Sequence, residues 1–197
     1  MKLYEGEPVF GNDQVADVSA LVDAVGARVG RHPLVIGIDG RSGGGKTTLA
    51  MTLALTLDAA LLSTDDFAWW HSMFDWPQLL IENGVQPLVR GESIDFVPPA
   101  WLQRGREGSI RAEAKNVVIV EGVGATQPAM REVLDLCVWV QTDADVARER
   151  GLLRDLAQRP DPAEAERFWN TWQSAENEFQ AKAKSWAVAD FVIRGDA

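Results

Sequence analysis

Apolar runs rich in β-branched residues recur along the chain and alternate with stretches of helical periodicity. The first run, from Leu34 to Asp39, ends in a glycine-rich turn, and good helix formers follow from Lys46 to Leu57. Strands that alternate with helices are typical of a mostly parallel sheet with helices on both faces. We therefore expect an α/β fold with a five-stranded sheet. The other strand candidates are Ala60 to Ser63, Val117 to Val120, Leu136 to Val140 and Phe191 to Ile193.

Helices are predicted before, between and after these strands. Valines and leucines at helical intervals predict an amphipathic helix in the N-terminal segment 1–31, which Arg31-His32-Pro33 ends. The last predicted helix carries an aromatic stripe, formed by Phe168, Trp172, Phe179 and Trp186, for which core packing is the favoured interpretation. The predicted helices are Asn12 to Val29, Gln127 to Leu134, Asp143 to Arg159 and Glu164 to Trp186.

Composition and charge narrow the class of protein. A chain of 197 residues with 46% hydrophobic composition suits one compact domain. The formal net charge of −10 is opposite to the basic surface that binding to a nucleic-acid backbone requires. The single cysteine, Cys137, allows no intrachain disulfide, and no apolar stretch approaches the roughly 18 residues that span a bilayer. We expect a cytoplasmic protein with neither a nucleic-acid nor a membrane partner.

The segment from Gly40 to Thr47 matches the pattern G-x-x-x-x-G-K-[ST] in full. In this pattern glycines let backbone N–H groups point at a phosphate, the lysine reaches the β/γ oxygens, and the hydroxyl ligates Mg²⁺. The context also fits, because the loop follows an apolar strand and opens a helix. The sequence therefore predicts a site for ATP and Mg²⁺. The residues expected to bind the nucleotide are Gly40, Ser42, Gly43, Gly44, Gly45, Lys46, Thr47 and Thr48.

Acidic side chains follow two of the predicted strands. Asp65 and Asp66 come after the run that begins at Ala60, and Glu121 directly follows Val120. In open α/β sheets, ligands bind outside the carboxyl ends of the strands. One carboxylate there can accept the proton of a hydroxyl that attacks phosphorus, and another can share Mg²⁺ with a threonine. Asp65 fits the base and Glu121 fits the metal shell, while a helix N-cap and a turn are the alternatives.

Taken together, these segments resemble the uridine kinase-like branch of P-loop kinases, from about Leu34 to Arg194. The resemblance implies a three-layer P-loop NTPase fold in one kinase domain over residues 1–197. It implies that Asp65 is the general base, that Lys46 acts on the phosphates, and that Thr47 and Glu121 hold Mg²⁺. The segments that carry it are Gly40 to Thr48, Ser63-Thr64-Asp65-Asp66-Phe67, Val118-Ile119-Val120-Glu121-Gly122, and Asp143-Ala144-Asp145 with Arg150 and Arg154-Asp155.

The resemblance also makes residues 143–160 a lid helix. Its Arg150 and Arg154 would reach the phosphates, which stabilises charge on the transferring group and excludes water. Surface pairs of these arginines with Glu149 and Asp155 are the alternative.

The acceptor is expected to bind in an insertion at residues 67–115, which is rich in proline and tryptophan. Phe74-Asp75-Trp76 and Ile94-Asp95-Phe96 resemble the family segments that hold an acceptor sugar. A histidine expected after the second segment is missing, and Pro98 and Pro99 stand there instead. The tryptophans either bind substrate or only pack. The residues expected to bind the acceptor, a nucleoside or related small metabolite, are Asp75, Asp95 and Phe67.

Other nucleotide-binding classes fit less well. A GTPase would need an [NT]-K-x-D segment, which the chain lacks. A kinase similar to shikimate or gluconate kinase would lack the long insertion that precedes Glu121. A regulatory protein that binds ATP without transferring phosphate remains an alternative to a phosphotransferase, and a homodimer is left open.

Overall fold

The computed structural model describes residues 1–11, 13–30 and 32–195. Asn12 and Arg31 belong to the predicted N-terminal helical segment and its break, and they lie outside the described residues, as do residues 196–197. Within the described ranges, no helix is long and apolar enough to cross a membrane.

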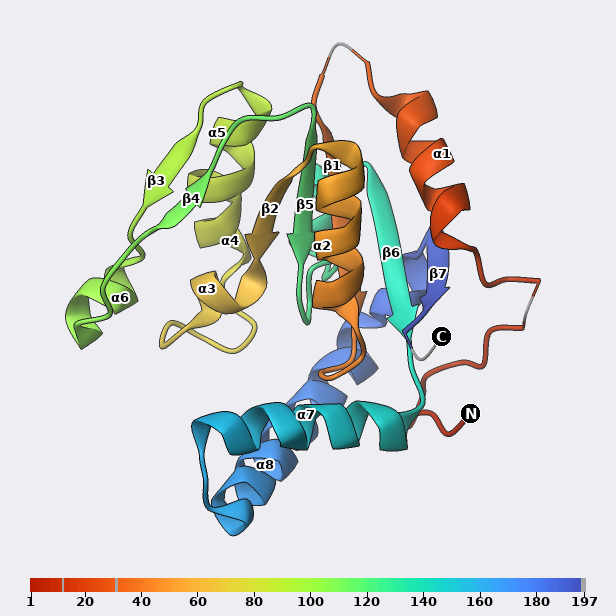
Figure 1. Cartoon of the computed structure of the whole chain (residues 1–197), viewed down its shortest axis with the longest axis vertical. Coiled ribbons are helices and arrows are strands. Elements are labelled where there is room, and N and C mark those ends of the chain that lie inside the picture. Colours follow the sequence, from red (N-terminus) through yellow and green to blue (C-terminus); the bar gives the residue numbers. More distant parts are fainter. Residues whose placement is uncertain (12, 31, 196–197) are drawn as a thin grey trace.

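A five-stranded parallel sheet forms the centre of the molecule, with the strand order β2-β5-β1-β6-β7 (Figure 1). Each strand is a short apolar run, and β1, β5 and β6 are buried along their whole length, as strands covered on both faces must be. The predicted α/β fold is confirmed. The strands are β1 (Leu34–Gly40), β2 (Ala60–Ser63), β5 (Val117–Glu121), β6 (Leu136–Gln141) and β7 (Phe191–Arg194).

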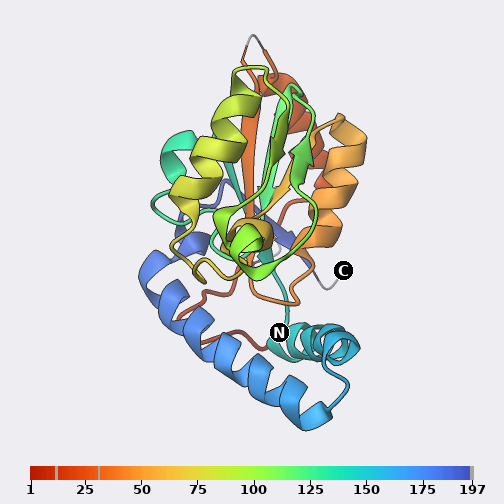
Figure 2. The same cartoon turned by 90° about the vertical axis from the view of Figure 1, so that its left-hand side faces the viewer.

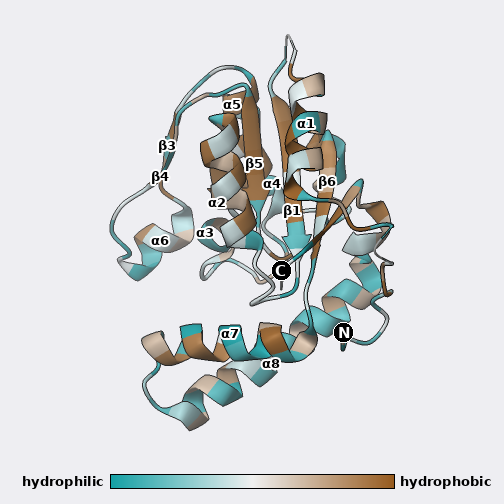
Figure 3. Ribbon diagram, turned by 45° about the vertical axis from the view of Figure 1, so that its right-hand side comes forward, coloured by the Kyte–Doolittle hydropathy of each residue, from teal (hydrophilic) through white to brown (hydrophobic). Residues whose placement is uncertain are grey.

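Helices cover both faces of the sheet, and apolar residues of the strands and of these helices together form the core (Figure 3). Alternate residues of β1 point to opposite faces: Leu34, Ile36 and Ile38 pack under α1 (Val18–Arg28) and α2 (Lys46–Leu57). Val35 faces the second layer, which contains helices from the insertion. That layer contains α3 (Thr64–Ala68), α4 (Pro77–Leu80), the π-helical turn η1 (Ile81–Val85) and α5 (Gln86–Val89).

The insertion also contains an antiparallel hairpin that the sequence patterns do not reveal. Its strands β3 (Ile94–Phe96) and β4 (Ile110–Ala112) enclose α6 (Pro99–Arg104). Strands of three residues are too short to show a period. The tryptophans of the region divide by environment, because Trp76 and Trp101 are buried in the core while Trp70 is 64% exposed.

Two long helices lie beyond the carboxyl ends of the strands. α7 (Ala144–Gln158) crosses beneath the sheet, and the chain then turns back into α8 (Pro162–Ala183), as Figures 1 and 2 show. Aspartates cap both helices, since Asp143 accepts from the N–H of Asp145 and Asp161 from that of Ala163. A 3₁₀ turn, η3 (Ser185–Val188), leads into β7.

The prediction of a helix from Gln127 to Leu134 is wrong. Only the 3₁₀ turn η2 (Arg131–Val133) forms there. Two local effects explain the difference: Pro128 cannot donate a backbone hydrogen bond, and the buried carboxylate of Asp39 accepts the N–H and hydroxyl of Thr126.

The N-terminal helix is shorter than its apolar pattern suggests. It begins at Val18, whereas Val15 forms a parallel bridge with Val192 of β7, and Ala16 N–H donates to the Val192 carbonyl at 2.9 Å. The apolar side chain of Val15 therefore packs beside the sheet as extended chain, and periodicity alone could not distinguish the two.

Gly151 provides a test of how α7 and α8 pack. A Cβ on Gly151 would lie 1.8 Å from the Trp169 ring, so we expect Gly151→Ala to destabilise the fold by about 1–3 kcal/mol in urea unfolding. Gly26→Ala on α1 is the matched control, because nothing lies within 4 Å of that position. It should be neutral or stabilise by up to about 1 kcal/mol through helix propensity. Equal effects of the two substitutions would contradict this packing.

Candidate active site

The glycine-rich loop between β1 and α2 has the backbone that a phosphate cradle needs. Gly43 and Gly45 adopt φ angles of 73° and 94°, which favour glycine, and Gly45 is the N-cap of α2. The Thr142 hydroxyl donates to the Gly44 carbonyl at 2.6 Å and fixes the loop against the end of β6. Lys46 is buried, and its Nζ donates to the Arg41 carbonyl at 3.0 Å.

Glu121 lies at the carboxyl end of β5, next to this loop. The Thr47 hydroxyl donates to Glu121 Oε2 at 3.1 Å, although 74 residues separate them in the chain. Burial raises the pKa of Glu121, and the positive charge of Lys46 partly opposes that rise. The negative charge of Asp65 also raises the pKa of Glu121, and the Asp65 side chain is exposed in the first turn of α3.

The parallel register brings these groups to one edge of the sheet. Ser63 at the end of β2 and Ile38 near the end of β1 are both paired with Glu121. Gly122 follows with a φ of 138°, and a Cβ there would lie 1.8 Å from the Thr64 hydroxyl. The Glu-Gly pair therefore lets β5 and the start of α3 approach closely.

Asp39 is a site residue that the sequence analysis missed. Its side chain has no exposed surface and accepts from the N–H groups of Gly40, Gly124 and Thr126 and from the Thr126 hydroxyl, at 2.7 to 3.0 Å. It ties the first residue of the phosphate loop to the loop that follows β5. A signal was present, because Asp39 is an acidic residue at the end of a predicted strand.

The two arginines of the predicted lid have different environments. Arg150 Nη1 donates to the Gly195 carbonyl at 2.6 Å and lies 3.8 Å from the position of a Cβ on Gly45, so it borders the phosphate loop. Arg154 Nε donates to Asp155 at 3.1 Å, the partner considered as an alternative, although Asp155 is buried and the pair is therefore not a surface pair.

The residues expected to bind an acceptor are spread over the insertion. Asp75 is exposed after α3, and its carbonyl is 3.1 Å from His71 Nε2. Asp95 is exposed on β3, where hydrogen bonds from Ser109 and Arg111 lower the pKa of its carboxyl. Phe67 has no exposed surface and stacks with Phe96 in the core, with ring centroids 6.1 Å apart.

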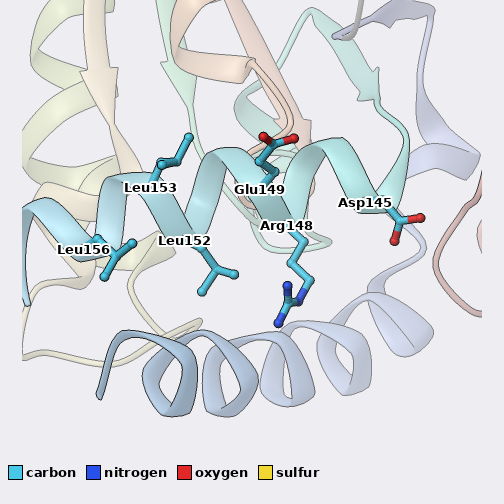
Figure 4. A pocket seen from close by; sticks show the side chains of 6 residues that line it. All are labelled: Asp145, Arg148, Glu149, Leu152, Leu153 and Leu156. Atoms are coloured by element: carbon cyan, nitrogen blue, oxygen red, sulfur yellow. The ribbon is translucent and has the colours of Figure 1, made fainter. Parts of the chain in front are cut away.

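Two surface hollows lie near the phosphate loop and on α7. One, of about 240 Å³, includes Gly45, Thr48, Arg150 and Gly195, and so adjoins the start of α2. The other, of about 260 Å³, lies on α7 and contains Leu152, Leu153 and Leu156 (Figure 4). In Figure 4 the guanidinium of Arg148 points toward α8, where it pairs with Glu166 at 2.7 Å. Only the first hollow includes residues of the phosphate loop.

The chemistry of Thr47 and Glu121 suits a magnesium ion bound together with a nucleotide. Both side chains offer oxygen, the donor that Mg²⁺ prefers. Across the described ranges, no three His, Cys, Asp or Glu side chains gather into a metal cluster. An ion at Thr47 and Glu121 would therefore take most of its ligands from phosphate oxygens and water, as Mg²⁺ commonly does.

Comparison with known proteins identifies the family. The chain is 30% identical over 185 residues to the uridine kinase of Anoxybacillus flavithermus, covering 83% of this chain and 86% of that protein. It is also 30% identical over 189 residues to the uridine kinase of a Geobacillus species, covering 84% and 87% of the two chains. The chain belongs to the uridine kinase-like family of P-loop kinases. No family model matches it.

A solved structure shares the fold of this chain. The structure, described as a possible uridine kinase from Bacillus stearothermophilus, superimposes with a TM-score of 0.61 at 19% identity. The match covers 89% of this chain and 96% of that chain. At this identity it supports the fold alone, and the sequence relatives carry the assignment.

Asp39→Asn tests the anchor that joins the two loops of this family member. An amide has one acceptor oxygen and would turn its NH₂ group toward N–H donors, so we expect a loss of at least about 3 kcal/mol in unfolding free energy. Chemical denaturation measures the loss. Asp23→Asn, at an exposed position on α1, is the control and should change little. An unchanged midpoint for Asp39→Asn would refute the anchoring role.

Proposed function

We propose that the chain is an ATP-dependent kinase that transfers the γ-phosphoryl group to a hydroxyl of a small molecule. A nucleoside is the first acceptor to test, because the sequence relatives are uridine kinases. The observation that supports the proposal most is the convergence of Lys46, Thr47, Glu121 and Asp65 at the carboxyl edge of the sheet. That arrangement combines a phosphate cradle, oxygen ligands and a free carboxylate.

Donor binding follows from the loop. The β-phosphate of ATP would face the backbone N–H groups of Gly43, Gly45, Lys46, Thr47 and Thr48. The Gly40, Ser42 and Gly44 positions would shape the turn, since the Gly44 N–H donates to the Arg41 carbonyl at 2.9 Å. Lys46 would turn from the Arg41 carbonyl to the β/γ oxygens when they arrive. Thr47 and Glu121 would hold Mg²⁺, which when bound neutralises charge on the β- and γ-phosphates.

Asp65 is the proposed general base. An acceptor hydroxyl would give its proton to the Asp65 carboxylate while its oxygen forms a bond to the γ-phosphorus and the bond to the ADP oxygen breaks. The Asp65 side chain is exposed, which suits this role because an acceptor must reach it. Arg150 already borders the phosphate loop, and Arg154, one turn further along α7, would have to leave Asp155 to join it.

Residues 67–115 are the proposed acceptor region. Asp75 is exposed, as a ligand for sugar hydroxyls must be. Asp95 is exposed but paired with Arg111, so binding an acceptor there would compete with that pair. Phe67 would act indirectly. Its packing against Phe96 would support α3 and hence the position of Asp65.

Acceptor-dependent ADP release tests the proposal. We expect the purified chain with ATP and Mg²⁺ to release ADP faster when uridine, cytidine or another member of a panel of nucleosides and sugars is added. Lys46→Ala should lower kcat/KM by about 10²–10³-fold, because a charge aimed at the transferring phosphate is lost. Binding of ATP without any acceptor-dependent release would favour a regulatory ATP-binding protein instead.

Asp65→Asn separates the base from the nucleotide site. We expect phosphoryl transfer to fall by roughly 10²-fold or more while the Kd for ATP, measured by calorimetry, stays nearly constant. Asp66→Asn is the matched control, because Asp66 pairs with Arg106 at 2.8 Å, and it should reduce transfer far less. A collapse of ATP affinity in Asp65→Asn would make Asp65 a nucleotide-binding or structural residue.

A further inference from the structure

One face of α8 contacts three separate parts of the proposed kinase site. Trp169, Trp172, Glu176 and Phe179 recur at intervals of three or four residues, so they lie along one side of the helix. They reach the lid helix, the phosphate loop and the segment that carries Asp75. Figure 2 shows α8, in blue, running obliquely below the sheet.

The contact with the phosphate loop is polar and specific. Trp172 Nε1 donates to the Ser42 hydroxyl, and the Ser42 N–H donates to Glu176 Oε1 at 2.9 Å. Next to these, Arg41 Nη1 donates to Asn177 Oδ1 at 2.9 Å. Ser42 is therefore bonded through both its backbone and its side chain to one helix.

Glu176 is an unusual group to bury for packing alone. It is 1% exposed, and burial raises the pKa of its carboxyl, which the charges of Lys46 and Arg41 oppose. A buried carboxylate is costly unless it is hydrogen-bonded and near opposite charge. Its position next to the phosphate-binding lysine links α8 electrostatically to the loop as well as through hydrogen bonds.

The contact with the insertion is aromatic. Phe74 stacks on Phe179, with ring centroids 4.1 Å apart and planes inclined by 9°, and its ring is 5.7 Å from that of Trp172. Gln127 Nε2 also donates to the Phe74 carbonyl at 3.2 Å. Because Asp75 is the next residue, α8 and Gln127 together fix where that carboxylate can lie.

Trp172 therefore contacts both proposed substrate sites, the phosphate loop and the acceptor segment (residues 69–76). Its indole N–H bonds to the phosphate loop and its ring packs on the acceptor segment. A shift of Ser42 when phosphates enter the loop would move Trp172, and through it Phe74. The third contact, Trp169 against Gly151, ties the same helix to the lid.

We propose that α8 couples the two substrate sites: Trp172 and Glu176 position Ser42, and Trp172 and Phe179 position Phe74, so nucleotide in the phosphate loop orders the acceptor segment. The inference rests on the proposed binding of ATP by this loop, and it does not require a particular acceptor. Trp172, Glu176 and Phe179 are positioning residues, because each acts through another group.

Amide hydrogen exchange with and without β,γ-imido-ATP and Mg²⁺ tests the coupling. In the wild-type chain the analogue should slow exchange in residues 40–47 and also in residues 69–76. Phe179→Leu keeps apolar volume but removes the stack, so the analogue should slow exchange in residues 40–47 alone. Trp172→Phe removes the indole N–H and should reduce the effect on residues 69–76 while changing the analogue's Kd by no more than about fivefold, the scale of one hydrogen bond.

Ser174→Ala and Glu178→Gln, at exposed positions of the same helix, are the controls and should behave as the wild type. Unchanged exchange of residues 69–76 in the wild type on binding the analogue would overturn the coupling, as would full slowing in Phe179→Leu. A purely structural role would lower the unfolding temperature of the variants without altering the response to nucleotide. Absence of acceptor-dependent ADP release is a separate result, and it would overturn the kinase proposal while leaving the exchange result to decide the coupling.

Discussion

Every strand of the central sheet runs in the same direction, and this constraint determines where chemistry can occur. Parallel pairing of β1 with β5, and of β5 with β2, aligns their carboxyl ends, so the phosphate loop, Glu121 and Asp65 emerge at one edge. The sheet, rather than a local segment of chain, brings Thr47 and Glu121 into contact, since they are 74 residues apart. Asp39 then joins the two loops that leave β1 and β5 through a carboxylate with four donors.

Two buried carboxylates from other parts of the chain contact the phosphate loop. Glu176 of α8 accepts the Ser42 N–H, and Glu7 of the N-terminal segment pairs with Arg41 at 3.4 Å. Burial raises the pKa of Glu7, while Arg41 and hydrogen bonds from Gln141 and Trp139 lower it. Buried ion pairs contribute little net stability but are costly to break, which favours a single arrangement of the loop. Arg41, the second residue of the motif, is thus a structural centre rather than a surface side chain.

The parts of the fold that the sequence predicted are those set by local pattern. The apolar runs of β1, β5 and β6 predicted buried strands correctly, and the phosphate-loop motif located the start of α2 because its glycines have a local backbone role. The apolar residues from Gln127 to Leu134 have helical spacing. The carboxylate of Asp39 nevertheless accepts the Thr126 N–H, and this tertiary contact overrides the local pattern. Glu176 could not be found in advance, because its partner Ser42 is 134 residues away and the helix around it gives no sign of which carboxylate is buried.

The stretch around Val15 also covers part of one edge of the central sheet. β7 is the last strand of the sheet, and an uncovered strand edge offers unpaired N–H and carbonyl groups to any other extended chain. Val15 and Ala16 occupy that edge at Val192 before the chain turns into α1. A few residues of extended chain thus act as a cap that discourages edge-to-edge aggregation, and their loss would expose a template for β-stacking.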